Sequence, residues 1–263
     1  MSEAVEPGWR RRGRPLLGTL VEVGVWPMCR EPNAAIDTAI NAAIDAAIDT
    51  AFEAVLEVQR CLSRFDPGSD LSRFHALGCG RAVRMQPATQ AVLGAAWELH
   101  RASDGAFDIS LGTAPLGWRC DGDELVKLEP ATRLDVGGIA KGYAVDVAVQ
   151  ALIDRGCSAG WVNAGGDLRV FGDVDLPVHV RDESTGGVRR FAELRQGAFA
   201  TSHFGQGSRS SLVSGRHRQA PKAHVSVAAP QCLWADALTK VVAIRGDTAG
   251  PILARFQASA WRH

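Results

Sequence analysis

The chain has 263 residues, enough for one large domain or two small ones with a sizeable buried core. Lys plus Arg and Asp plus Glu number 29 each, so the charge balance gives no electrostatic reason to expect nucleic acid or an anionic membrane as a partner. The six cysteines include no CxxC pair. This excludes a zinc signature and a disulfide framework, and it fits a reducing compartment.

The N-terminus shows no export signal. Residues 1–14 contain no apolar core of a signal peptide and no lipobox, and no run of 18 apolar residues predicts a membrane-spanning helix. The basic run over residues 10–14 is short and typical of a solvated tail. We therefore expect a flexible arm over residues 1–14, a single domain over residues 15–263 and a cytoplasmic location.

The first half of the chain predicts one strand and then helices. Residues 15–26 alternate in part and predict a strand that begins near Gly18 and Thr19. A four-residue repeat of Ala and Ile over residues 34–53 predicts a long packing helix that ends near Leu62. Its isoleucines lie four apart, so their stripe drifts by about 40° per repeat. Residues 63–75 predict a turn and a short capped helix.

The second half mixes strands and helices without a strict β-α-β order. Residues 87–103 predict an amphipathic helix. The chain then leaves this helix at Asp104 and Gly105 and enters a predicted strand that ends near Gly112. A helix is expected over residues 234–242, and a helix followed by a strand over 251–261. Further strands are expected over residues 83–87, 161–172 (two, around a glycine turn), 176–181, 188–194 and 225–229. This order predicts an α+β fold with largely antiparallel sheets and packed helices.

The stretch from Leu134 to Arg155 predicts a short strand, a two-glycine turn and an amphipathic helix. Gly137 and Gly138 permit a sharp bend and the close approach of a ligand. Lys141 falls in the first helical turn, where the macrodipole disfavours a cation by about 0.3–1 kcal/mol. A phosphate bound at the helix N-terminus would reverse this penalty. The alternative is that the glycines only begin a helix and Lys141 is solvated, since the spacing matches neither a P-loop nor GxGxxG.

Two further residues allow two interpretations each. Asp236 lies near the N-terminus of a predicted helix, where a carboxylate is either a ligand of a divalent cation or an N-cap. Phe107 is either a core residue or a platform for a flat ring.

Four stretches in order resemble the FAD:protein FMN transferase family, the ApbE-like proteins. They are LLGTLVEV from Leu16, SDGAFDISLG from Ser103, LDVGGIAKGYAVD followed by NAGGDLRVFG, and SVAAP with ADALTK near the C-terminus. The resemblance spans nearly the whole chain. It implies an α+β fold that binds FAD and Mg²⁺ and transfers FMN from FAD to a Thr or Ser hydroxyl of an acceptor protein, with release of AMP.

The resemblance also implies roles for particular residues. The implied FAD-binding residues are Leu17, Gly105, Ala106, Phe107 and Lys141. The implied metal ligands are the backbone carbonyl of Gly138 and the side chains of Asp236 and Thr239, and Asp236 is also implied in catalysis.

The chain departs from the family pattern at two places. Ser211 and Ser214 stand where the family has a His and an Asp, and a serine accepts no proton near neutral pH without a base of its own. His217 is the expected substitute base, with His224 as the alternative. Lys240 occupies the place of the usual Thr or Ser metal ligand, four residues after Asp236. It therefore either replaces the cation or turns away, while Thr239 shares the helix face of Asp236.

Three functions follow from the resemblance. The first, which we favour, is FMN transfer to a protein hydroxyl. The second is FAD binding without transfer, and the third is Mg²⁺-dependent hydrolysis of FAD with water as the acceptor.

Overall fold

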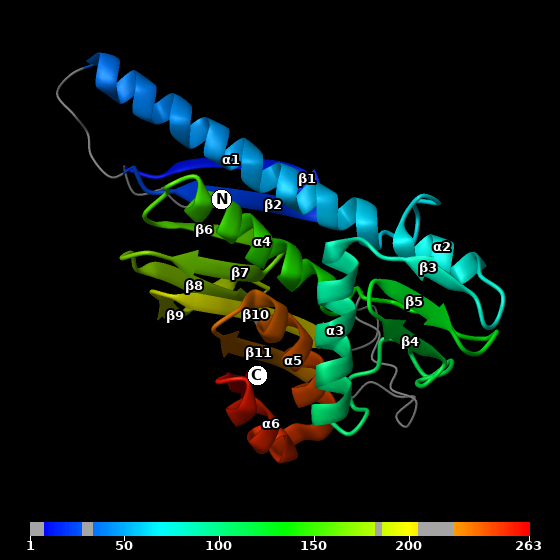
Figure 1. Cartoon of the computed structure of the whole chain (residues 1–263). Helices are drawn as coiled ribbons and strands as arrows, with labels where there is room; N and C mark the ends of the chain where they lie inside the picture. The colour runs from blue at the N-terminus through cyan, green and yellow to red at the C-terminus, as the bar shows by residue number, and fades with distance from the viewer. Residues whose placement is uncertain (1–7, 28–33, 182–185, 205–222) are drawn as a thin grey trace.

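The computed structural model describes residues 8–27, 34–181, 186–204 and 223–263. Its largest sheet consists of β1 (Arg10–Leu16), β2 (Thr19–Val25), β6 (Gly160–Ala164), β7 (Asp167–Phe171), β10 (Gly197–Phe204), β11 (Ala223–Ala229) and β12 (Ser259–Arg262). The seven strands pair in the order β1-β2-β6-β7-β10-β11-β12, and every pair is antiparallel (Figure 1). The predicted α+β class with largely antiparallel sheets is therefore confirmed.

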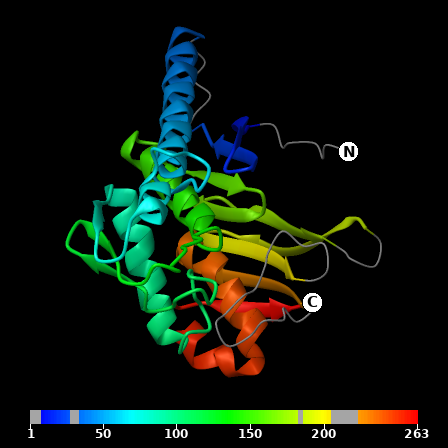
Figure 2. The same ribbon diagram turned by 90° about the vertical axis from the view of Figure 1, so that its right-hand side faces the viewer.

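Helices cover one face of this sheet and a hairpin lies on the other. The helices are α1 (Ala34–Leu62), α4 (Ala140–Asp154) and α5 (Cys232–Arg245), and the hairpin consists of β8 (Leu176–Arg181) and β9 (Val188–Leu194) (Figure 2). Successive side chains of a strand point to opposite faces. On β10, Ala200 accordingly belongs to the main core, whereas Phe199 packs with Val178 and Val180 of the hairpin.

A smaller unit lies at one end of the large sheet (Figure 1). It contains α2 (Asp70–Ala76), β3 (Ala82–Arg84), α3 (Pro87–Ala102), β4 (Trp118–Asp121) and β5 (Glu124–Lys127), with its strands in the order β3-β5-β4. The chain closes with the 3₁₀ helix η1 (Gly246–Ala249), α6 (Gly250–Arg255) and β12. The expected short helix is α2, capped by the Ser69 side chain. The sequence did not predict β4 or β5.

The isoleucine stripe of α1 joins the main core from Ile44 onward. Ile36 is 46% exposed, whereas Ile48 and Phe52 are at most 1% exposed. The reason is visible in Figure 1, where the N-terminal end of α1 extends past the sheet. No helix among the described residues is long and apolar enough to cross a membrane.

The basic run expected to belong to a flexible arm forms part of β1. Arg10 donates from Nε to Asp45 Oδ1 of α1 at 2.8 Å, and Arg14 pairs with Asp49 at 2.6 Å. Alternate arginines of the strand thus meet acidic side chains one helical turn apart. Residues 10–14 are therefore not part of a flexible arm, as was expected, but of a strand. Residues 1–7 lie outside the described residues.

Two expected strands do not form. After Phe107 the chain turns, because the Asp108 carboxylate accepts hydrogen bonds from the backbone N–H groups of Ser110 at 2.8 Å and Gly112 at 3.0 Å. The stretch before Gly137 is not paired with a strand either. The N–H of Leu134 donates instead to Nε2 of His75 at 2.9 Å. Side chains in both places take the hydrogen bonds that a neighbouring strand would otherwise supply.

Candidate functional site

The N-terminal halves of α4 and α5 meet, and each helix supplies a carboxylate to the first turn of the other. Asp146 of α4 accepts from the N–H groups of Cys232 at 2.9 Å and Leu233 at 2.8 Å. Asp236 of α5 accepts from the N–H of Gly142 at 3.3 Å. A Cβ on Gly142 would lie 2.3 Å from the carbonyl oxygen of Cys232, so only glycine permits this contact.

Asp236 does not cap its own helix. The N-cap of α5 is Gln231, and Asp236 lies one turn further on with a fully buried side chain. The N-cap interpretation of Asp236 is therefore wrong, and its carboxylate needs partners elsewhere, because a buried charge is stable only when paired.

Those partners form a cluster of four charges, which we call the lysine–aspartate cluster: Lys141, Asp167, Asp236 and Lys240. Lys240 Nζ pairs with Oδ1 of Asp236, and Lys141 Nζ pairs with Asp167 and lies 3.9 Å from Oδ2 of Asp236. The aspartate side chains are at most 3% exposed, whereas that of Lys141 is 33% exposed. Two ammonium groups thus balance two carboxylates, and Lys141 is the member most open to a ligand.

The cluster changes the pKa of three of its members. Burial raises the pKa of Asp167 to about 6, with the charge of Asp236 adding to the effect and Lys141 opposing it. Burial would also raise the pKa of Asp236, but the charges of Lys141 and Lys240 outweigh it and lower that pKa. Burial would lower the pKa of Lys141, but Asp236 and Asp167 raise it. Lys141 and Asp236 therefore stay charged near neutral pH.

The two-glycine turn lies against this cluster. A Cβ on Gly138 would lie 3.2 Å from Cε of Lys240 and 3.8 Å from Cε2 of Phe107. Neither Gly137 nor Gly138 has a left-handed φ, so the expected need for backbone freedom is not why glycine stands here. The missing side chain of Gly138 instead gives room to Lys240.

Phe107 reaches the turn from a tightly bonded loop. Its N–H donates to Ser103 Oγ at 3.0 Å, and its carbonyl lies 2.9 Å from Nδ1 of His100. Gly105 has the left-handed φ of 75° expected after a helix. Both Ala106 and Phe107 are buried, which agrees with the core interpretation of Phe107, while its ring edge faces Gly138.

The hairpin turn with Leu17 is also near the cluster. Leu17 has a φ of 54° and donates its N–H to Oε1 of Gln59 at 2.7 Å. In the same turn, Oγ1 of Thr19 would lie 2.4 Å from a Cβ on Gly165, two residues before Asp167. The β1–β2 turn therefore lies beside the β6–β7 turn that leads into the cluster.

The Thr239 side chain points toward the sheet and not toward the carboxylate of Asp236. Its hydroxyl lies 2.9 Å from Ser202 Oγ on β10 and 2.7 Å from the backbone oxygen of Asp236. Lys240 Nζ contacts that same backbone oxygen at 2.9 Å, in addition to the carboxylate. Lys240, and not Thr239, is thus the residue that contacts the Asp236 carboxylate.

The residues around Asp236 do not fit a divalent cation. Mg²⁺ needs only one or two carboxylates when phosphates complete its shell, so a single aspartate would suffice. However, Lys240 already binds Oδ1 of Asp236, and the cluster is neutral as it stands. A dication would add two positive charges beside two ammonium groups, which Coulomb repulsion opposes. Among the described residues, no group of three or more His, Cys, Asp or Glu side chains could hold a metal.

The expected base is not part of the described site. His217, Ser211 and Ser214 lie outside the described residues. His224 lies on β11 directly before Val225, a main-core residue on the helix face. Its side chain therefore points to the opposite face of the sheet, where its ring lies 4.9 Å from that of His263. The structure does not bring His224 to the cluster.

Sequence reasoning missed three polar residues that build the site: Asp146, Asp167 and Ser202. Asp146 ends the LDVGGIAKGYAVD stretch, and Asp167 directly follows the glycine pair of NAGGD. Both lie inside the stretches that suggested the family. For Asp167 the available signal was its place next to a glycine turn, whereas Asp146 lies eight residues after Gly138 and had no such neighbour. Ser202 carries no such signal, because only the packing of α5 on β10 brings it to Thr239.

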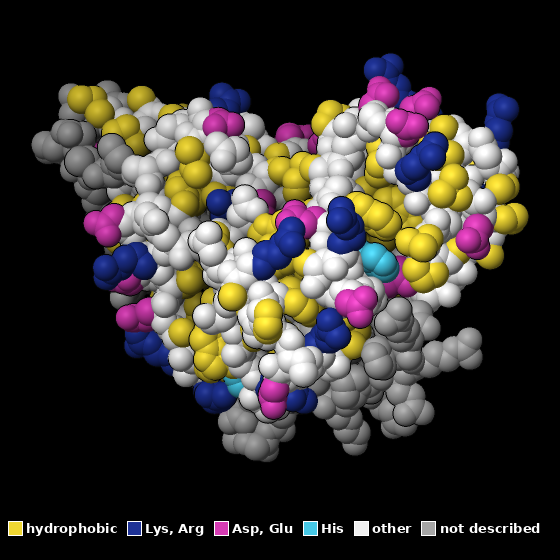
Figure 3. All heavy atoms as spheres, turned by 60° about the horizontal axis from the view of Figure 1, so that its bottom comes forward, with side chains coloured by type: hydrophobic (Ala, Val, Ile, Leu, Met, Phe, Trp, Pro, Cys, Tyr) yellow, Lys and Arg dark blue, Asp and Glu magenta, His cyan; other side chains and the backbone are white. Residues whose placement is uncertain are grey.

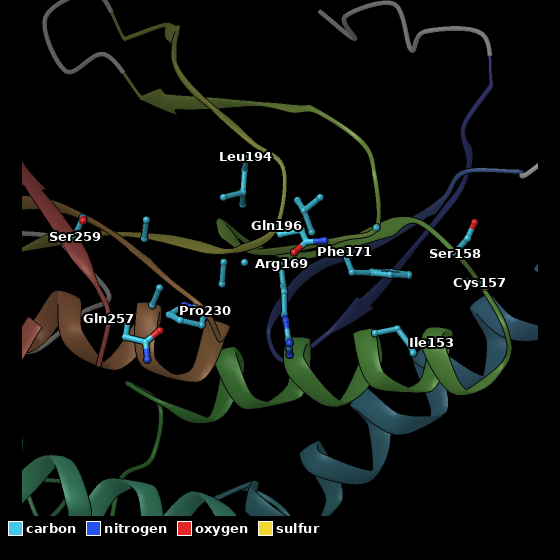
Figure 4. A pocket seen from close by; sticks show the side chains of 16 residues that line it. Ile153, Cys157, Ser158, Arg169, Phe171, Leu194, Gln196, Pro230, Gln257 and Ser259 are labelled. Atoms are coloured by element: carbon cyan, nitrogen blue, oxygen red, sulfur yellow. The ribbon is translucent and has the colours of Figure 1, made fainter. Parts of the chain in front are cut away.

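A separate cavity of about 730 Å³ lies at the N-terminal end of β10 (Figure 4). Its lining includes Ile153, Arg169, Phe171, Gln196 and Pro230, and no member of the lysine–aspartate cluster. Arg169 is held by Asp146 at 2.8 Å, so it is not free to bind an anion there. On the face in Figure 3, Lys and Arg side chains alternate with Asp and Glu, without an extended patch of one sign.

The fold and the site together define an α+β protein in which a glycine turn, a buried aromatic ring and the first turns of two helices meet around a neutral cluster of lysines and aspartates. The model of the ApbE family matches residues 17–126 and 115–260, and the chain belongs to this family.

Solved structures show the same fold. The apo flavinyl transferase ApbE of Pseudomonas stutzeri is 19% identical, with a TM-score of 0.76 over 96% of this chain and 90% of that one. The flavin transferase ApbE of Vibrio cholerae is 18% identical, with a TM-score of 0.75 over 97% and 93%. An ApbE protein of Thermotoga maritima is 21% identical, with a TM-score of 0.78 over 97% and 94%. No curated protein matches the chain.

Proposed function

We propose that this protein transfers FMN from FAD to a Thr or Ser hydroxyl of an acceptor protein and releases AMP. The observation that carries the proposal is the meeting of Gly138, Phe107, Lys141 and Asp236, from three separate stretches, in one place in a chain of the ApbE family. Two solved structures of the same fold are described as flavin or flavinyl transferases.

The reaction breaks the phosphoanhydride bond of FAD and forms a phosphoester with the acceptor. The acceptor hydroxyl attacks the phosphorus of the FMN half, its O–P bond forms, and the bridging P–O bond breaks so that AMP leaves with the bridging oxygen. Negative charge on the phosphoryl oxygens has to be stabilised, and an ammonium group near a helix N-terminus does so. Lys141 is partly exposed and charged at that position, so we assign it to the diphosphate.

The remaining expected roles follow from the geometry of the cluster. Asp236 has a lowered pKa and is a poor base, so it acts as the counter-charge that orients Lys141 and Lys240. The proton of the acceptor hydroxyl needs another acceptor, and we assign it to His217. Leu17, Gly105, Ala106 and Phe107 are proposed to border the bound FAD.

The test is incubation of the purified protein with FAD and a peptide that carries an acceptor Thr, beside the same peptide with Thr replaced by Val. Mass spectrometry is expected to find an FMN adduct on the Thr peptide alone, with AMP released in equal amount. Release of AMP and FMN without an adduct would replace the proposal with hydrolysis of FAD. Tight binding of unchanged FAD would replace it with a carrier role.

A further inference from the structure

Lys240 lies where a cation would bind between the Asp236 carboxylate and the glycine turn. Its Nζ contacts Oδ1 and the backbone oxygen of Asp236, and it lies 3.4 Å from Ser202 Oγ. Its Cε lies 3.2 Å from the Cβ position of Gly138. The lysine therefore reaches across from α5 to the turn that begins α4.

The ammonium group takes up the oxygen atoms that a hard cation would use. Carboxylate and backbone carbonyl oxygens are ligands of Mg²⁺, and here Lys240 binds one of each from Asp236. The side chain of Lys240 is only 14% exposed, and the nearby Thr239 hydroxyl is engaged with β10. A side chain held in this way offers an ammonium group at the place of a metal.

The net charge of the cluster also disfavours a divalent cation while Lys240 is present. With Lys141, Asp167, Asp236 and Lys240 all ionised the cluster is neutral, and removal of Lys240 alone leaves a net charge of −1. A buried uncompensated carboxylate is costly, so a divalent cation becomes favourable only when this lysine is absent.

We propose that the ammonium group of Lys240 replaces the divalent cation, so that this protein binds FAD and acts on its diphosphate without Mg²⁺. The inference rests on the proposed function for the identity of the ligand, and on the contacts of Lys240 for the absence of the metal.

The test measures FAD and metal binding separately. FAD is titrated into the wild-type protein by isothermal calorimetry, once with EDTA and once with Mg²⁺, and Mn²⁺ alone is titrated with detection by electron paramagnetic resonance. We expect the same FAD affinity in both conditions and no Mn²⁺ site that involves Asp236. An increase in FAD affinity with Mg²⁺ of about fivefold or more, which is typical of coupled sites, would overturn the proposal.

Variants that lack the Lys240 ammonium group are expected to gain the metal site that the wild-type protein lacks. Lys240→Thr replaces the ammonium with a hydroxyl, and we expect it to gain Mn²⁺ binding and an FAD affinity that depends on Mg²⁺. The added substitution Asp236→Asn is expected to remove the new Mn²⁺ site. The matched control is Arg255→Met, because Arg255 pairs with Glu98 outside the cluster and its loss removes one positive charge without creating a metal site.

The outcomes separate this inference from the proposed function. If the wild-type protein binds no FAD in either condition, the proposed function fails, and the Mn²⁺ titrations still decide the role of Lys240. If the wild-type protein binds Mn²⁺ and Asp236→Asn abolishes this binding, the inference fails while FMN transfer stands. These wild-type measurements hold even if Lys240→Thr does not fold.

Discussion

Asp146 and Asp236 each accept hydrogen bonds from the first turn of the helix that carries the other. Asp146 binds two N–H groups of α5, at Cys232 and Leu233, and Asp236 binds one of α4, at Gly142. The free N–H groups of a helix start need acceptors, and the positive end of the macrodipole favours anionic ones. The contact between the two helices therefore fixes where Asp236 stands relative to Lys141.

Replacement of Asp146 should loosen this contact. Asp146→Ala leaves two N–H groups of α5 and the guanidinium of Arg169 without their acceptor, so we expect a loss of about 2–4 kcal/mol in the free energy of unfolding. Urea denaturation measures it. The control is Asp154→Ala, because Asp154 is exposed at the end of α4 and, among the described residues, bonds only Gln150. A change within about 0.5 kcal/mol is expected. Equal losses in both variants would show that the caps contribute nothing specific.

Gly142 and Gly94 provide a matched pair of glycine substitutions. A Cβ on Gly142 would meet backbone atoms of Cys232 at 2.3 Å, so Gly142→Ala should push α4 and α5 apart and cost about 1–3 kcal/mol. Gly94 lies in α3, and no described atom outside the backbone of its own helix turn lies within 4 Å of a Cβ there. Gly94→Ala should therefore stabilise the protein by about 0.4–1 kcal/mol. Thermal unfolding followed by circular dichroism compares them. A stable Gly142→Ala variant would contradict the close helix contact.

Lys141 should distinguish phosphate from the flavin ring. Lys141→Met keeps the aliphatic stem and removes the charge, so we expect FAD binding to weaken by about 10- to 100-fold, the loss typical of one charged hydrogen bond. Riboflavin, which has no phosphate, should lose far less. Flavin fluorescence quenching measures both affinities after circular dichroism has shown that the variant is folded. Equal losses for the two ligands would remove Lys141 from the diphosphate.

His75 should make stability depend on pH. Its Nε2 accepts the N–H of Leu134, and burial, with the charges of Arg133 and Lys127, lowers its pKa below the ordinary 6.5. As the pH falls below 6.5, the unfolded chain binds a proton that the folded chain does not. This contribution to stability is therefore present above pH 6.5 and is lost as the pH falls toward the folded pKa.

The check is the free energy of unfolding in urea at several pH values from about 7.5 to 5. His75→Gln keeps a hydrogen-bond acceptor without a titrating group, so it should flatten the pH dependence relative to the wild-type protein. An unchanged slope in His75→Gln would assign the pH dependence to other groups.

Local sequence signals determined most of the helices and strands of this protein. The Ala and Ile repeat predicted α1 and an end near Leu62, because helix propensity and a four-residue apolar spacing act within one turn. The glycine pair of NAGGD separated β6 from β7, and the apolar pattern marked α4. The same stretches, in order, carried the membership of the ApbE family, since a family pattern is itself a property of sequence.

Only the tertiary structure decided which charges pair. Lys141 and Asp167 are 26 residues apart, and Asp236 follows after a further 69, so no local pattern relates them. The sequence left open whether Lys240 replaces a cation or turns away. The close packing of α4 on α5 places Lys240 on Asp236 and against Gly138. Periodicity determines which face of a helix is buried. Which buried charges meet depends on how helices from distant parts of the chain pack. Because an unpaired charge is costly in the low dielectric of the core, the charges that meet there must pair.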